Sequence, residues 1–326
     1  MRYATFEVET PVGPVRRVGI VTSAGDLLDV NLAFAHTLAG RVDRSRARAI
    51  ADALVPADLA VLLANGEAAR EAVLRAADLT DAPLDALSAG GGRLIYRHEE
   101  VRLLAPLPSP PSLRDCAAFE QHVKNSTRGN VPAEWYEMPV YYKGNPRSVV
   151  GTGADVVVPR GAERLDYELE FAIVIGRAGR DVPPESAAAH IAGYTVFNDV
   201  SERRQQFKEM RGGLGPAKGK DRDGWNVLGP YLVTADAWDP AEPHTMVARV
   251  AGEVWSRGST DSIHHSVAEI VSYLSRAEEL RPGDVIGAGT VGWGSGLELG
   301  RYPQAGDLVE LEIDGLGVLA NRWVAA

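Results

Sequence analysis

Two carboxylates stand two residues apart inside an apolar stretch, residues 166–176, which reads DYELEFAIVIG. If this stretch is a strand, residues i and i+2 project from the same face roughly 6–7 Å apart, so Glu168 and Glu170 point toward one position. Carboxylate oxygens favour Mg²⁺, Mn²⁺ or Ca²⁺, and burying two negative charges without a cation is costly. The pattern therefore indicates a divalent-metal site, and the alternative is the solvent-facing edge of an amphipathic strand.

A proline-rich segment, residues 106–111, has four prolines in six positions, which excludes a continuing helix or a central strand. We place a domain boundary there, with a small α+β domain at residues 1–105, a linker at 106–112 and a larger domain at 113–326. In the smaller domain we expect strands at residues 3–8 and 16–22 and alanine-rich helical segments between Ala47 and Ala77.

The larger domain is expected to be rich in strands, because short apolar runs recur with glycine and proline between them. These runs are residues 155–158, 170–175, 191–197, 231–234 and 246–250. Residues 308–313 alternate apolar and charged side chains before Asp314-Gly315, which predicts a hairpin. One helical stripe runs from Ile263 to Leu274, with Thr260 and Asp261 as candidate N-caps. The fold class is therefore mixed α+β and strand-rich.

The charge balance of the 326-residue chain limits its partners. A net charge of −10 argues against broad contact with nucleic acid or an anionic membrane surface, so small-molecule partners are expected. The single cysteine, Cys116, excludes an internal disulfide and a thiolate metal cluster. No stretch approaches the roughly 18 apolar residues that a membrane helix needs. We expect a cytoplasmic protein.

A third acidic candidate follows the apolar run at residues 191–197. Asp199 is a possible oxygen ligand beside the two glutamates, and its alternative role is the N-cap of a helix that begins near Ser201. If that helix begins at once, Arg203 and Gln206 lie near the same face as Asp199. There they can meet an anionic substrate or remain solvated helix surface.

A second group of candidate residues lies just after the proline-rich segment. His122 is the candidate general base, because a neutral imidazole accepts a proton from water near pH 7 and a nearby carboxylate would orient it. A lone histidine is more often structural than catalytic. Asp115 is either a fourth metal ligand or a partner of Arg114, and the sequence leaves these alternatives open.

These segments in this order resemble the fumarylacetoacetate hydrolase family over roughly residues 113–323. The matching pieces are residues 114–122, 166–170, 193–199, 215–221, 228–230, 281–284 and 289–290. The resemblance implies a C-terminal mixed β-roll that binds Mg²⁺, Mn²⁺ or Ca²⁺, usually within a homodimer. Its metal ligands would be Asp115, Glu168, Glu170 and Asp199.

The resemblance also implies roles for the residues around the metal. His122 matches the histidine that activates water, Glu298 matches its partnering glutamate, and Lys220 matches the pocket lysine. The residues implied to bind substrate are Tyr142, Arg203, Gln206 and Thr290. Two positions differ from fumarylacetoacetase, where tyrosines stand in place of Ala117 and Met210; a smaller or more apolar acyl group is one consequence.

The expected activity is metal-dependent hydrolysis of a carbon–carbon bond in a β-diketo acid or acylpyruvate. A metal polarises the carbonyl that water attacks and stabilises the enolate that leaves. The alternatives on the same scaffold are a 2-oxo acid decarboxylase, a hydratase or a keto–enol isomerase. A non-catalytic, metal-dependent binding protein is the alternative from another class.

Overall fold

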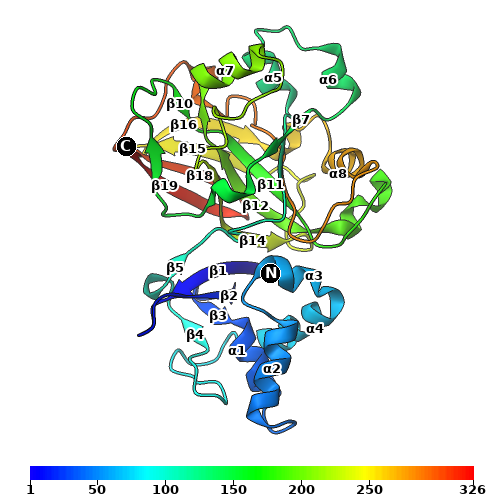
Figure 1. Ribbon diagram of the computed structural model, residues 1–326, viewed down its shortest axis with the longest axis vertical. Coiled ribbons are helices and arrows are strands. Elements are labelled where there is room, and N and C mark those ends of the chain that lie inside the picture. The colour runs from blue at the N-terminus through cyan, green and yellow to red at the C-terminus, as the bar shows by residue number, and fades with distance from the viewer.

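The computed structural model describes residues 1–326, and the N-terminal third forms the smaller of the two lobes in Figure 1. Its strands are β1 (Arg2–Val8), β2 (Val15–Val21), β3 (Leu27–Asp29), β4 (Ile95–Tyr96) and β5 (Arg102–Leu103). Its helices are α1 (Val30–Thr37), α2 (Arg44–Leu54), α3 (Leu59–Ala64), α4 (Gly66–Ala77) and the 3₁₀ turn η1 (His98–Glu100). The two expected strands and the alanine-rich helices are confirmed. Buried alanines such as Ala51 and Ala72 let α2 and α4 pack closely on α1.

The C-terminal lobe contains most of the strands. They are β6 (Leu113–Cys116), β7 (Tyr141–Gly144), β8 (Val149–Val150), β9 (Val156–Val158), β10 (Leu165–Asp166), β11 (Leu169–Ile175), β12 (Ile191–Asp199), β13 (Ser201–Glu202), β14 (Asn226–Thr234), β15 (Thr245–Val250), β16 (Glu253–Ser259), β17 (Val285–Gly287), β18 (Leu308–Ile313) and β19 (Gly317–Ala325). Its helices are α5 (Glu120–Ser126), α6 (Ala133–Glu137), α7 (Arg203–Arg211), α8 (Val267–Ser275) and α9 (Gly296–Leu299), with 3₁₀ turns η2 (Pro146–Ser148), η3 (Pro184–His190) and η4 (Thr260–Ser262). The predicted hairpin at Asp314-Gly315 joins β18 to β19.

One twelve-stranded sheet runs through both lobes in the order β4-β3-β2-β1-β14-β12-β11-β17-β6-β7, with β5 on β1 and β8 on β14. The lobes meet where β1 pairs antiparallel with β14, which places Tyr3 opposite Leu232. Residues 106–112 carry neither helix nor strand, and the elements before and after them share this sheet. The division of the chain at this segment therefore stays a prediction.

A second sheet, in the order β16-β15-β18-β19-β9, packs on the first within the C-terminal lobe. The core between them includes Phe171 and Val196 from the first sheet and Met246 and Leu311 from the second, all inaccessible to solvent. Burial of these alternating apolar faces is what holds two sheets together. The mixed α+β, strand-rich fold class is confirmed.

Two helix starts differ from the sequence-based expectation. Thr260 and Asp261 do not cap the long helix, because they lie in η4 and α8 begins at Val267. The true N-cap is Ser266, whose hydroxyl accepts from the Glu269 amide while the Glu269 carboxylate accepts from the Ser266 amide. In this reciprocal capping box the two side chains accept hydrogen bonds from the backbone amides of Ser266 and Glu269, which have no partner within the helix.

The helix after Asp199 also begins later than expected. Ser201 and Glu202 form the short strand β13, and α7 begins at Arg203 with Glu202 as its N-cap. The Glu202 carboxylate accepts a 2.7 Å hydrogen bond from the Gln205 amide. The alternative reading of Asp199 as an N-cap is therefore wrong, and its carboxylate is free for another role.

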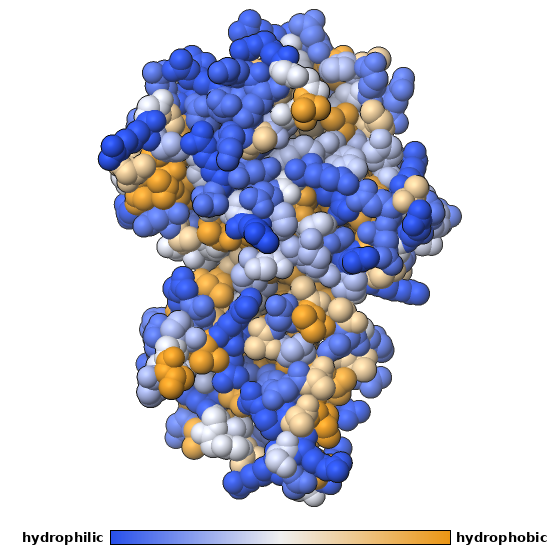
Figure 2. Space-filling view, in the orientation of Figure 1, coloured by the Kyte–Doolittle hydropathy of each residue, from blue (hydrophilic) through white to orange (hydrophobic).

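None of the helices combines the length and the apolarity that crossing a membrane requires. Figure 2 shows a face on which hydrophilic residues predominate in both lobes and hydrophobic residues form small groups.

Candidate active site

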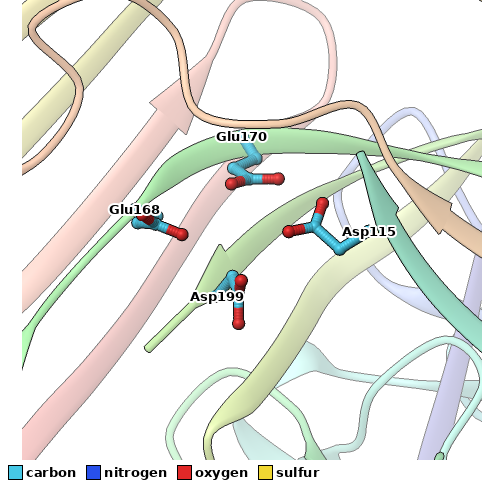
Figure 3. Close-up of side chains that lie close together, drawn as sticks. All are labelled: Asp115, Glu168, Glu170 and Asp199. Carbon is cyan, nitrogen blue, oxygen red and sulfur yellow. The ribbon is translucent and has the colours of Figure 1, made fainter. Parts of the chain in front are cut away.

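The four candidate metal ligands, Asp115, Glu168, Glu170 and Asp199, turn their carboxylates toward one gap (Figure 3). One oxygen from each lies within 4.8 Å of the others, and all four residues are at most 4% exposed. The sheet order explains this convergence, because β6, β11 and β12 carry Asp115, Glu170 and Asp199, and β17 lies between β6 and β11. Glu168 lies one residue before β11, so the strand is shorter than expected, yet both glutamates face the gap.

The charges in this cluster are only partly balanced. The Lys220 ammonium contacts Asp199 and lies 2.6 Å from a Glu168 oxygen. Burial raises the pKa of Asp199 to about 6, with the ammonium opposing the shift. Burial, followed by the charges of neighbouring carboxylates, holds the pKa of both Glu170 and Asp115 well above the usual range. Full ionisation of all four carboxylates would therefore leave an excess of negative charge at the gap.

Glu168 differs from the other three carboxylates. Burial acts to raise its pKa, but Lys220 and Arg203 outweigh burial and the pKa is lowered. Glu168 is therefore the ionised anchor of the cluster, whereas Glu170 and Asp115 ionise at a cost that a further cation would remove.

A divalent cation fits this donor set. Asp115 Oδ1 and Asp199 Oδ1 are buried and accept no hydrogen bond, although buried carboxylate oxygens normally have a partner. Oxygen-only ligands at this spacing suit a hard ion. The cluster can hold one divalent metal ion, with all four carboxylates supplied by the chain itself.

The candidate base and its partner are in contact. His122 Nδ1 lies 2.9 Å from Glu298 Oε2, and the Glu298 carboxylate is completely buried. Burial acts to raise the pKa of Glu298, but the hydrogen bonds from His122, Asn125 and the Trp293 amide together with the charge of His122 outweigh burial, and the pKa is lowered. An ionised carboxylate only accepts, so Nδ1 donates to Glu298 and a neutral His122 has its lone pair on Nε2, where the Ser126 hydroxyl lies 3.4 Å away. His122 Nε2 lies 4.0 Å from Glu168 Oε1, beside the metal ligands.

Three further residues hold Glu298, and the sequence analysis did not identify them. The Ser295 hydroxyl donates to Oε2 at 2.9 Å, while Asn125 Nδ2 and the Trp293 amide each donate to Oε1 at 2.8 Å. Ser295 and Glu298 form an S-x-x-E pattern that a search for capping boxes would find. Nothing in the sequence links Asn125 to a glutamate 173 positions later.

Arg203 is buried against carboxylates of the protein itself. Its guanidinium donates at 2.7 Å to Asp166 and to Glu168, and Gln206 accepts from it at 3.0 Å. Asp166 also accepts from the amides of Gly296 and Leu297, at 2.7 and 2.8 Å. Asp166 is thus a positioning residue, because it ties α9, which carries Glu298, to β10 and to Arg203. The sequence analysis did not identify this role.

Thr290 and Tyr142 also contact metal-ligand candidates. The Thr290 hydroxyl donates to Glu170 Oε1 at 2.9 Å, and the Gly289 amide donates to Oε2 at 3.0 Å. The Tyr142 hydroxyl donates to Asp199 Oδ2 at 2.9 Å. In this geometry both hydroxyls orient the cluster, and their predicted contact with substrate is not tested by it.

A cavity of about 800 Å³ opens over the cluster. Its lining includes the candidate residues Asp115, His122, Tyr142, Glu168, Glu170, Arg203, Gln206, Lys220 and Thr290. Phe207, Met210 and Leu214 add an apolar part to the lining, and Leu214 is fully exposed. The candidate base, the acidic cluster and an apolar wall therefore share one space, which suits an anionic ligand with a less polar end.

The fold and the site thus define a protein with a buried carboxylate cluster for a divalent ion and an adjacent histidine–glutamate pair. The family model for the fumarylacetoacetate (FAA) hydrolase C-terminal domain matches residues 113–324. The chain belongs to the fumarylacetoacetate hydrolase family.

Two similar relatives are named as tautomerases. The mitochondrial oxaloacetate tautomerase FAHD2A of Homo sapiens is 34% identical over 236 residues, which cover 71% of this chain and 72% of the relative. The oxaloacetate tautomerase YisK of Bacillus subtilis is 30% identical over 274 residues, which cover 82% and 87%.

Solved structures show the same fold. A fumarylacetoacetate hydrolase from Exiguobacterium antarcticum has a TM-score of 0.72 and 29% identity over 99% of this chain and 100% of its own. A putative HpcE protein from Mycobacterium smegmatis has a TM-score of 0.75 and 26% identity, with both chains fully covered. The resemblance to the family is thus confirmed, and the similar proteins carry the names of more than one reaction.

Proposed function

We propose that this protein catalyses keto–enol tautomerisation of a small 2-oxo dicarboxylate of the oxaloacetate type, with Mg²⁺ or Mn²⁺ held by the four carboxylates. The observation that carries this proposal is His122, held through Nδ1 by Glu298, with its Nε2 in the same cavity as the cluster and 4.0 Å from Glu168 Oε1. Tautomerisation needs one base beside a polarised carbonyl and consumes no water. The names of the two relatives above support this reaction over the hydrolysis expected from the sequence.

The steps of this reaction use the residues already described. When bound, the divalent ion would polarise the 2-oxo carbonyl and stabilise negative charge on its oxygen. His122 Nε2 removes a proton from the carbon next to that carbonyl, and the same proton is returned to the enolate oxygen. Glu298 keeps the proton on Nδ1 and stabilises the imidazolium formed in between. No atom is gained or lost.

Lys220 is the proposed contact for the substrate's carboxylate or enolate oxygen. Its side chain is only 6% exposed, and its ammonium lies at the cavity wall between Glu168 and Asp199. Thr290, Gln206 and Tyr142 are proposed to donate to the remaining oxygens as the substrate enters. Arg203, which is 1% exposed and donates to Asp166 and Glu168, is proposed to position Glu168 rather than to bind substrate.

The second candidate function is hydrolysis of a carbon–carbon bond in an acylpyruvate or another β-diketo acid. The apolar lining by Phe207, Met210 and Leu214 favours it, because a four-carbon dicarboxylate leaves that side of an 800 Å³ cavity unfilled. In this reaction His122 Nε2 would take a proton from water instead of carbon, and the acyl tail would lie along the apolar wall.

A substrate panel separates the two functions. The enol form of oxaloacetate absorbs in the ultraviolet, so its conversion is followed directly, with Mg²⁺ or Mn²⁺ present and with chelator as the control. Acylpyruvates of increasing tail length are tested in parallel for release of pyruvate. We expect metal-dependent enol conversion that His122→Ala abolishes. Pyruvate release without enol conversion would refute tautomerisation and support hydrolysis. Inactivity in both assays would refute both proposed functions.

The proposed activity implies a small keto acid as the substrate. A homodimer is proposed separately, from the family resemblance. A cytoplasmic location remains a prediction, because one of the similar relatives is named as mitochondrial.

A further inference from the structure

A second cavity, of about 410 Å³, lies in the N-terminal lobe and shares no lining residue with the cavity over the carboxylates. Arg17 of β2, Arg44 and Arg48 of α2 and Tyr96 of β4 line it. Figure 1 shows these elements in the lower lobe, away from the strands that carry the metal ligands. The activity proposed above makes no use of this cavity.

Three arginines at one small cavity stand out in a chain whose net charge is −10. Arg44 and Arg48 are four residues apart on α2 and therefore lie on the same face of the helix. Arg48 is paired with Asp52 at 2.9 Å, and Arg17 lies 3.5 Å from the buried Asp29. Arg44 forms no ion pair in the structure, so the cavity carries an uncompensated guanidinium.

Tyr96 also lines the cavity. The residue is only 9% exposed, and its hydroxyl, which water can reach, forms no hydrogen bond with the rest of the protein. It is therefore available to a ligand. The ring itself is fixed, since the Arg93 guanidinium lies 5.2 Å from its centroid. The cavity thus offers a neutral hydroxyl donor in addition to the arginines.

The remaining wall of the cavity is apolar. Leu32 and Ala35 of α1 and Ala47 of α2 supply it, and Ala47 is 4% exposed. A bare inorganic ion would leave this wall without contacts. A volume of about 410 Å³ is within the range of about 300–1,000 Å³ for small-molecule sites.

We propose that this cavity binds a small organic anion, with a carboxylate or phosphate head against the arginines and the Tyr96 hydroxyl and a compact apolar body against the alanine-rich wall. Arginine is suited to such heads because its planar guanidinium can donate two parallel hydrogen bonds to two oxygens. Carboxylate and phosphate present the same oxygens, so the experiment has to distinguish them.

The test is calorimetric titration of the full-length protein with benzoate and with phenyl phosphate, which share an apolar ring and differ in the head. Phenol and inorganic phosphate are the controls for the ring alone and the head alone. We expect one equivalent of benzoate or of phenyl phosphate to bind per chain, and the tighter of the two identifies the head. Binding of neither would overturn the proposal, as would phenol binding equally well.

A matched pair of variants tests whether the anion binds in this cavity. Arg44→Glu reverses the unpaired charge at the first residue of α2, where an acidic side chain is compatible with the helix dipole, and should weaken binding at least about tenfold. Arg46→Glu makes the same charge change on the same helix but outside the cavity, and should leave affinity within about twofold. Equal weakening by both variants would mean non-specific attraction and would overturn the proposal.

A third variant tests the cavity without changing its charge. Ala47→Leu adds apolar volume at the wall and should abolish binding while the protein keeps its far-ultraviolet circular dichroism and its activity at the carboxylate site. Wild-type affinity in Ala47→Leu would overturn the assignment to this cavity.

Discussion

Replacing Glu298 by glutamine should change which nitrogen of His122 carries the proton. All four groups around the carboxylate donate to it: His122 Nδ1, the Ser295 hydroxyl, Asn125 Nδ2 and the Trp293 amide, at 2.8–2.9 Å. The glutamine NH₂ cannot face Asn125 and Trp293, because both are fixed donors. It must face Ser295, whose hydroxyl can rotate, and His122, whose Nδ1 then becomes the acceptor.

The other tautomer of His122 carries its proton on Nε2 and cannot act as a base toward the cavity. Loss of general-base catalysis costs about 10²–10⁴-fold in kcat, and KM should change little because Glu298 does not face the substrate. One mismatched buried donor should lower the free energy of unfolding by about 1–3 kcal/mol. The variant therefore remains folded and measurable.

The assay is oxaloacetate enol conversion at saturating Mg²⁺, combined with ¹⁵N NMR of the histidine side chains to identify the tautomer. Glu253→Gln, the same substitution at an exposed position, is the matched control and should behave like wild type. Because the two residues act as a unit, adding Glu298→Gln to His122→Ala should cause no further loss. A kcat within threefold of wild type, or an unchanged tautomer, would refute this reasoning.

Three further predictions follow from the packing and charge of the site. Gly287→Ala would place a Cβ 2.2 Å from Asp115 Oδ1 and should weaken Mn²⁺ binding about 10–100-fold by calorimetry; unchanged affinity would contradict it. Mn²⁺ affinity should rise from pH 5 to pH 8, because the metal binds ionised carboxylates and the pKa values of Asp199, about 6, and Glu170 are raised; pH-independent binding would show the assignment to be wrong. Phe171→Ala should lower the free energy of unfolding by about 3–5 kcal/mol in denaturant titration, since Phe171 is completely buried between the sheets; a loss below about 1 kcal/mol would contradict this packing.

The convergence of the carboxylates could be inferred from the sequence more directly than the contacts that support them. Glu168, Glu170 and Asp199 stand beside apolar runs, and strand geometry alone indicates that the two glutamates face one side. Asp166 and Asn125 could not be assigned in the same way, because their partners in α9 lie 130 and 173 positions away along the chain. Ser295 lies only three residues before its partner Glu298 and could have been found from that spacing.

The local errors have a similar cause. Helix α8 was expected to start at Thr260–Asp261 because both residue types favour N-caps, but the reciprocal bonds of Ser266 and Glu269 fix the start later. The pairing of β1 with β14 also could not be predicted from the sequence, since the two strands are more than two hundred residues apart and a proline-rich segment separates them. Apolar patterns predict strands well and give no information on which distant strands pair.

The most direct test of the account is calorimetric titration of chelator-treated protein with Mn²⁺, comparing wild type with Asp199→Asn. The asparagine oxygen can accept from Tyr142 and Lys220 as Asp199 Oδ2 does. Its NH₂ then takes the place of Oδ1, which has no partner in the wild type, so the fold should be retained. The account predicts one ion per chain in the wild type and an affinity more than about 100-fold weaker in the variant. Equal affinity and stoichiometry in the two proteins, or no binding to the wild type, would contradict it.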